Sequence, residues 1–256
     1  MARIRLILAT TSLCSIAALA YGAVPDYVTK ALADAHRPAT EISRDVNRHP
    51  GELIAFAGIK PGMKVVDLLP GVGAAAYYTR IFSGVVGPKG KVYAYYGIQY
   101  DTRLKNQNID PDKQGDQFAT DYPNVIALHA PLQDFKTPEL VDVIWTSDNF
   151  HDTHNKAYAT DVKMMLTGIY ASLKPGGIFM DVDHRAVKGA GAGVTETLHR
   201  MDEDIAKQEI EAAGFKLIEE STILTNPADD DNKRVQEAGE HDHTDQMVLK
   251  FQKPLR

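Results

Sequence analysis

The chain has 256 residues, 44% of them hydrophobic and 24% charged, which is enough for one large domain with a substantial apolar core. Its formal net charge of -6 at pH 7 argues against binding to a nucleic-acid backbone as the main activity. Cys14 is the single cysteine, which excludes an intrachain disulfide and a thiolate-rich metal site. Stability must therefore come from an ordinary core.

Residues 1–22 have the features of an export signal. Two arginines open an apolar run over 6–19, and small residues that suit a signal peptidase follow at Ala18, Ala20 and Gly22. A membrane anchor is the alternative, but it needs a longer apolar run, and threonines and serines interrupt this one. The sequence therefore predicts a periplasmic or secreted protein with no stable membrane insertion after the signal is cleaved.

The next part of the chain predicts helices and parallel strands. Residues 23–60 form an N-terminal helical segment, with a short helix over 52–59 that Gly58 closes. From residue 61 to 256, strand-length apolar runs alternate with helical stretches over 73–85 and 155–173. The predicted strands cover 64–69, 91–96, 124–130, 140–147 and 178–184. This alternation is typical of a parallel α/β sheet with helices on both faces.

The C-terminal part follows a different pattern. A helix over 202–213 has Asp202 as its N-cap and Gly214 after its end. Strands over 216–224 and 245–253 have no helical stretch between them, so we expect them to pair antiparallel. Two polar stretches remain. The first, 97–122, is a lid, a substrate loop or a solvated insertion, and the second, 225–244, is expected to be mobile.

Residues 65–80, VVDLLPGVGAAAYYTR, lead from a buried strand through a Pro-Gly turn into a helix. Gly71 and Gly73 would let backbone N–H groups and the helix N-terminus approach a nucleotide closely. Glycines also serve simple tight turns, so the motif alone leaves both interpretations open. Its position at the carboxyl end of the first strand favours a cofactor loop, because ligands bind at such ends in open parallel sheets.

An ordered set of segments resembles the class I S-adenosylmethionine-dependent methyltransferases. The segments are VVDLLPGVG, GKVYAYY, VDVIWTSDNFHD, LKPGGIFMDVDHRA, TLHRMD, IEAAGFKLIEES and QMVLKFQKP, within about residues 41 to 254. NFHD, DHRA and the Pro-Gly of the first loop resemble a bacterial, often exported branch of that class. The resemblance implies a Rossmann-like, seven-stranded, mostly parallel sheet with an antiparallel last strand. It also implies S-adenosylmethionine as cofactor and a small-molecule substrate.

The resemblance places the cofactor at the ends of the first, second and fourth strands. The residues it implies are Asp67, Pro70, Gly71, Gly73, Tyr96 and Asn149. Leu69 stands where the class usually has its first glycine. Tyr96 stands where an acidic residue usually holds both ribose hydroxyls, and tyrosine offers one hydroxyl in its place.

Candidate catalytic residues follow the fourth and fifth strands. His151 and Asp152 are placed to polarise or deprotonate an acceptor hydroxyl or amine, and His184 in DVDHRA is expected to meet His151 across the pocket. Asp183 and Arg185 could join them, and His199 and Arg200 could contribute from a loop above the sheet. Two structural interpretations compete: Asp152 and Asn155 cap the next helix, or the DVDHRA residues form a structural Asp-Arg or His-Asp pair.

HDTH and EHDH have the residue types of metal ligands, but two histidines on a flexible loop bind weakly without a fixed third ligand. The sequence therefore predicts no functional metal. The leading hypothesis is a methyltransferase that acts on an unidentified small molecule. One alternative is an exported methyltransferase-like protein without methyl transfer that binds another ligand or a metal. Another is a histidine-based hydrolase or other metalloenzyme on the same scaffold.

Overall fold

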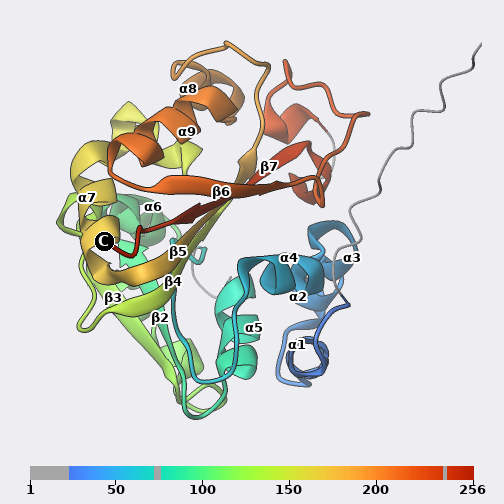
Figure 1. The fold of residues 1–256 in the computed structure, drawn as a ribbon, viewed down its shortest axis with the longest axis vertical. Helices are drawn as coiled ribbons and strands as arrows, with labels where there is room; N and C mark the ends of the chain where they lie inside the picture. The colour runs from blue at the N-terminus through green and yellow to red at the C-terminus, as the bar shows by residue number, and fades with distance from the viewer. Residues whose placement is uncertain (1–22, 72–75, 239–240) are drawn as a thin grey trace, which may run out of the picture.

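The computed structural model describes residues 23–71, 76–238 and 241–256. The predicted export signal over 1–22 and the cofactor residue Gly73 therefore lie outside the described residues. Within them, a seven-stranded sheet has the order β3-β2-β1-β4-β5-β7-β6 (Figure 1). The strands are β1 Lys64–Leu68, β2 Lys91–Gly97, β3 Val125–Ala130, β4 Val141–Ser147, β5 Leu173–His184, β6 Lys216–Ser221 and β7 Gln246–Gln252.

The strand directions match the prediction. β1 pairs in parallel with β2 and β4, and the parallel pairing continues to β3 and β5. β7 runs antiparallel to both of its neighbours, β5 and β6. The predicted Rossmann-like fold with an antiparallel last strand is confirmed.

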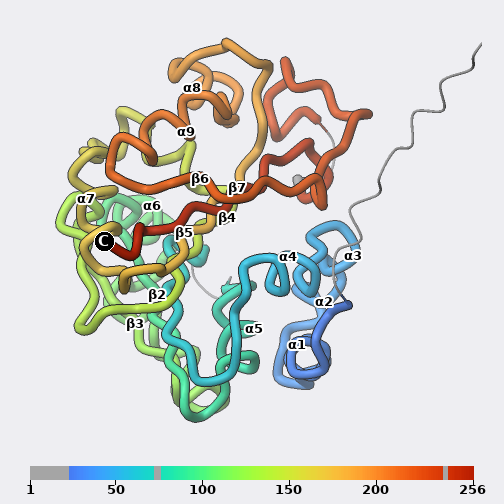
Figure 2. Tube along the Cα trace, viewed as in Figure 1, coloured from blue at the N-terminus to red at the C-terminus, as the bar shows by residue number. Residues whose placement is uncertain are grey.

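Helices cover both faces of the sheet, as expected (Figures 1 and 2). On one face, α1, α4 and α5 pack with inward side chains such as Val65 and Trp145. On the other face, α7 and α9 pack with Val66 and Ile144. Neighbouring strand residues point to opposite faces, which explains why these strands read as continuous apolar runs. The helices are α1 Asp26–Leu32, α2 Ala39–Ile42, α3 Asp45–Arg48, α4 Pro50–Ala57, α5 Tyr77–Val86, α6 Asp101–Asn106, α7 Val162–Ser172, α8 Val194–Leu198 and α9 Glu203–Ala212.

Several predicted bounds were wrong. The strand expected over 216–224 ends at Ser221. The helix start predicted at residue 73 lies outside the described residues, within which α5 begins at Tyr77. The helix expected from residue 155 begins at Val162, because the Asp161 carboxylate accepts the Met164 N–H and caps it there. β5 begins at Leu173, before the KPGG turn, with a register shift against β4.

The described residues of both polar stretches contact the rest of the domain. In the first, α6 and short 3-10 turns bury Tyr100, Leu104 and Phe118. In the second, ion pairs join Asp229 to Arg200 and Asp242 to Arg44. No helix in the described part of the chain is both long and apolar enough to cross a membrane.

Candidate functional site

A cleft of about 720 Å³ opens at the carboxyl ends of β1 and β4. One wall is Asp67 of β1 with the turn that follows the strand, up to Gly71, and a second runs from Ser147 at the end of β4 to Asp152. Helices α2 and α3 contribute Glu41 and Arg48 from the N-terminal segment, and Arg44 lies between the two helices. Carboxyl ends of neighbouring parallel strands meet at one sheet edge, which is the usual place for a ligand in this fold.

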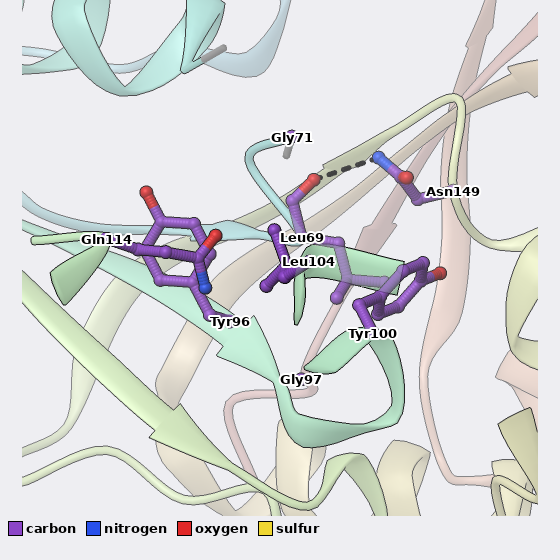
Figure 3. A pocket seen from close by; sticks show the side chains of 8 residues that line it. All are labelled: Leu69, Gly71, Tyr96, Gly97, Tyr100, Leu104, Gln114 and Asn149. Carbon is purple, nitrogen blue, oxygen red and sulfur yellow. Dashed lines mark hydrogen bonds between the residues drawn. The ribbon is translucent and has the colours of Figure 1, made fainter. Parts of the chain in front are cut away.

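The turn after β1 is held in an unusual backbone conformation. Leu69 has a φ of 59°, in the left-handed region, and Gly71 has a φ of 120°, which side-chain-bearing residues rarely adopt. The Asn149 amide donates a 3.0 Å hydrogen bond to the Leu69 carbonyl (Figure 3). It also donates a 2.5 Å hydrogen bond to the Ser147 carbonyl. Asn149 thus fastens the turn after β1 to the end of β4.

A smaller pocket adjoins this turn. Its lining includes Leu69, Gly71, Tyr96, Tyr100, Leu104 and Gln114 (Figure 3). Tyr96 lies near the end of β2 as the resemblance implied, and its hydroxyl accepts a 3.5 Å hydrogen bond from Gln117. The walls of this pocket are apolar and aromatic, with the amides of Gln114 and Asn149 as polar groups, and its volume is about 20 Å³. The two pockets share Leu69, Gly71 and Asn149; Tyr96 lines the smaller one, and Asp67 and Pro70 line the cleft.

Asp67 is a buried acid at the base of the cleft, 3% exposed. Its Oδ2 accepts a 2.6 Å hydrogen bond from the Thr79 hydroxyl on α5. Burial raises the pKa of Asp67 to about 7, although the Thr79 hydroxyl and the Arg48 charge favour the ionised form. A cation bound nearby would favour the ionised form of the Asp67 carboxyl.

Arg48 is a wall residue that the sequence reasoning missed. It bonds Asp148 at 2.9 Å, Asp242 at 2.7 Å and the Ser147 hydroxyl at 2.9 Å. Its guanidinium also lies 4.8 Å from the centre of the Tyr77 ring. Burial opposes its charge, yet Asp148 and Asp242 hold the pKa of Arg48 well above its usual range. No local motif marks such a residue, because its partners come from distant parts of the chain.

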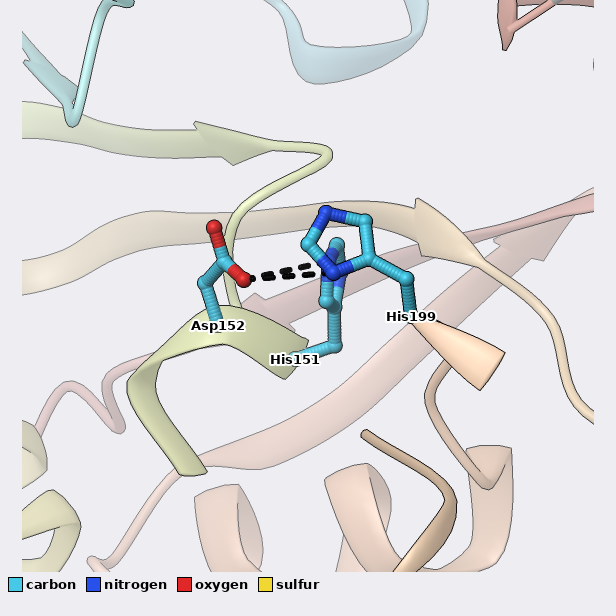
Figure 4. A group of neighbouring side chains, drawn as sticks. All are labelled: His151, Asp152 and His199. Atoms are coloured by element: carbon cyan, nitrogen blue, oxygen red, sulfur yellow. Dashed lines mark ion pairs between the residues drawn. The ribbon is translucent and has the colours of Figure 1, made fainter. Parts of the chain in front are cut away.

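A polar cluster closes the other end of the cleft. Nδ1 of the fully buried His151 lies 2.6 Å from Asp183 Oδ1, and the His151 backbone N–H donates to Asp183 Oδ2 over 2.7 Å. His151 Nε2 and His199 Nδ1 lie 3.6 Å and 3.5 Å from Asp152 Oδ1 (Figure 4). Burial opposes protonation, but Asp183 and Asp152 raise the pKa of His151 above its ordinary value. Asp152 and His199 line the cleft, while His151 lies behind them.

The other predicted residues take separate positions. His184 is fully buried, and its Nδ1 lies 2.6 Å from the Thr244 hydroxyl; its ring centre is 5.7 Å from that of His151. It is not among the described side chains that line the cleft. Arg185 pairs with Glu203 and Asp245 instead of His151. Since Asp161 caps α7, the capping interpretation of Asp152 and Asn155 was wrong.

No protein-family model matches the chain, and no curated protein sequence matches it. Solved structures of similar fold do exist. A SAM-dependent methyltransferase from Aquifex aeolicus is 20% identical with a TM-score of 0.51, over 88% of this chain and 96% of that one. The N-methyltransferase NodS from Bradyrhizobium japonicum WM9 is 12% identical with a TM-score of 0.51, over 83% and 96%.

A third similar structure is the 1,6-didemethyltoxoflavin-N1-methyltransferase of Burkholderia thailandensis, which was solved with S-adenosylhomocysteine bound. It is 17% identical to this chain with a TM-score of 0.51, over 84% of this chain and 79% of that one. At these identities the similarity establishes the fold: this chain has the Rossmann-like α/β fold of the class I methyltransferases.

Proposed function

We propose that this chain is an exported S-adenosylmethionine-dependent methyltransferase that acts on a small molecule. The observation that carries the proposal is the turn after β1, where Leu69 and Gly71 have positive φ and Asn149 fastens the turn beside a cleft. Three proteins of this fold are described as methyltransferases, one of them with S-adenosylhomocysteine bound. Export remains part of the proposal through the leader over 1–22.

The described residues fit such a cofactor in chemical terms. Tyr96, Tyr100 and Leu104 line an apolar pocket of about 20 Å³ beside the turn, which would have to widen to take an adenine ring. Asp67 offers a carboxyl to a cationic amine, and its loss of a proton would then be favoured. When bound, the cofactor supplies an electrophilic methyl group on a sulfonium. Gly71 leaves room for the close approach of the backbone, because it carries no Cβ.

The acceptor is proposed to bind at the Asp152 end of the cleft. Asp152 is held by the Tyr100 hydroxyl and the Asn155 amide, each at 3.4 Å. Asp183 accepts the Nδ1–H of His151, which leaves the Nε2 lone pair directed toward Asp152 and His199. A proton from an acceptor hydroxyl or amine can pass to this cluster. His184 would act only on the position of His151, through ring contact.

Calorimetric titration with S-adenosylmethionine and S-adenosylhomocysteine tests the cofactor assignment directly. We expect saturable binding, and Gly71→Ala should weaken it because a Cβ at a φ of 120° forces the turn to move. Gly189→Ala is the matched control, since Gly189 also has positive φ, at 81°, with open space around it. Absence of heat in the unaltered chain, or equal effects of the two variants, would contradict the proposal.

Transfer itself needs a separate measurement. Cofactor carrying a labelled methyl group is incubated with small hydroxyl, amine and thiol compounds, and label in the product is counted. Asp152→Asn should lower the rate with any accepted compound while leaving cofactor affinity unchanged. Saturable cofactor binding without transfer to any compound would favour the alternative, a methyltransferase-like protein that binds a ligand without turnover.

A further inference from the structure

The polar cluster at the end of the cleft has the composition of a metal site. His151, Asp152 and His199 each offer one ligand atom, and these atoms lie within 4.8 Å of one another (Figure 4). His151 and Asp152 come from the 3-10 turn His151–His154 after β4, and His199 follows α8. His199 lies far from the other two in the sequence, so spacing alone could not reveal the set.

One ligand atom is buried and lacks a hydrogen bond. His151 is fully buried, and its Nε2 has no hydrogen-bond partner among the described residues. A buried imidazole nitrogen without a partner is uncommon, because desolvation is then uncompensated. Nε2 is also the atom that lies 3.6 Å from the Asp152 carboxylate. A bound cation between them would use this lone pair.

Asp183 prepares His151 for this role. It accepts the Nδ1–H at 2.6 Å, which fixes the tautomer and leaves Nε2 as the basic nitrogen. It also accepts the His151 backbone N–H, so the ring and the turn are positioned together. Carboxylate–histidine–metal arrangements of this kind orient the ligand and raise its basicity.

The distances suit a small divalent ion. In a tetrahedral site with bonds of about 2.1 Å, neighbouring ligand atoms lie about 3.4 Å apart. Asp152 Oδ1 lies 3.6 Å from His151 Nε2 and 3.5 Å from His199 Nδ1, close to this expected separation of ligand atoms. Two imidazoles and one carboxylate favour a first-row transition ion over magnesium or calcium, which prefer oxygen ligands.

We infer that His151, Asp152 and His199 bind one divalent transition-metal ion, for which zinc is the first candidate. Asp152 and His199 line the cleft, so a remaining coordination position would face the space where a small molecule enters. Three protein ligands and one open position is the arrangement of catalytic zinc sites. This inference stands on the ligand geometry and does not depend on methyl transfer.

The test is metal titration of the full chain, purified without a histidine tag and stripped with a chelator. Calorimetry with Zn²⁺ and visible absorption with Co²⁺ should both give one ion per chain. His199→Ala and Asp152→Asn should abolish this one-to-one binding, and Asp183→Asn should weaken it by about 10- to 100-fold through loss of ligand orientation. Circular dichroism establishes that each variant is folded.

His129→Gln is the control, because His129 faces two carboxylates, Asp101 and Asp112, away from the cleft. It should bind the ion as the unaltered chain does. The inference is overturned if the stripped chain shows no saturable binding of the ion, or if folded His199→Ala and Asp152→Asn chains bind it normally. Loss of binding in the His129→Gln variant would also overturn it. Titration of the stripped chain with S-adenosylmethionine measures cofactor binding without the metal. Failure of the metal inference can therefore be told apart from failure of the methyltransferase proposal.

Discussion

Leu69 occupies a backbone position that favours glycine. Its φ of 59° costs a residue with a Cβ about 1–2 kcal/mol, yet its side chain is 6% exposed and packs in the core. The same position is the one at which the methyltransferase pattern usually has glycine. Apolar burial and the Asn149 hydrogen bond therefore offset backbone strain at this turn.

Two substitutions separate strain from packing at Leu69. Leu69→Ala should destabilise the fold by about 2–4 kcal/mol, because it removes buried methyl groups and keeps the strain. Leu69→Gly should lower the free energy of unfolding by no more than Leu69→Ala does, because glycine relieves the backbone strain. At an unstrained position glycine would be the more destabilising of the two. Urea unfolding of both variants measures the difference. A glycine variant clearly less stable than the alanine variant would show that strain contributes little.

Asp67 should make stability depend on pH. Its pKa of about 7 in the folded chain lies above the value of about 3.9 for a free aspartate, so the folded state holds the proton more tightly. The unfolding free energy should therefore fall as pH rises from about 4 to about 7. Thr79, Arg48, Glu41 and Tyr96 are the groups that face this carboxyl.

Asp67→Asn removes this titration. The unfolding free energy of the variant, relative to that of the unaltered chain, should rise with pH. Between the two pKa values the rise is at most about 1.4 kcal/mol per pH unit. Chemical unfolding at a series of pH values from about 5 to about 8 measures that rise. Glu211→Gln, at an exposed position on α9, is the control and should follow the unaltered chain. A constant difference between Asp67→Asn and the unaltered chain would contradict the prediction.

At the scale of elements, the short helix α3 joins the N-terminal segment to the cleft. Arg48→Met should cost about 3–5 kcal/mol, because Asp148 and Asp242 would lose a buried cation. Arg44→Met removes a more exposed partner of the same Asp242 and should cost about 1 kcal/mol. Urea unfolding of both variants tests the ranking. Equal losses would mean that Asp148 does not depend on Arg48.

The strands and the residues at their ends could be predicted from the sequence. Apolar runs of strand length indicated the sheet, and Asp67, Tyr96 and Asn149 lie within or just after such runs. Arg48 could not be predicted, since its partners Ser147 and Asp242 lie 99 and 194 residues away. The start of α7 was missed because several polar candidates precede it, and only the observed bond from Met164 identifies Asp161 as the cap.

At the scale of the whole molecule, residues 23–60 are part of the core on one face of the sheet. Val28, Leu53, Ile54 and Ile59 are fully buried in one cluster with side chains of β1, β4 and α5. Each such side chain contributes about 1.5–3 kcal/mol on burial, and together they rival the roughly 5–15 kcal/mol of a typical domain, to an order of magnitude.

A chain that begins at residue 61 should therefore fail to fold cooperatively. Circular dichroism during heating would reveal a broad transition or none, and the hydrophobic dye ANS would bind the exposed face. The full chain is the control. A sharp transition at the same temperature in the shortened chain would show that residues 23–60 form a separate unit.

The bond between Arg48 and Asp242 also determines when the cleft can form during synthesis of the chain. They are 194 residues apart, yet their bond ties one wall of the cleft to the C-terminal segment that contributes Gln236 to the same cleft. A polypeptide made from its N-terminus must extend past residue 242 before both residues are available. A compound that needs both walls of the cleft should therefore not bind a nascent chain that ends before residue 236.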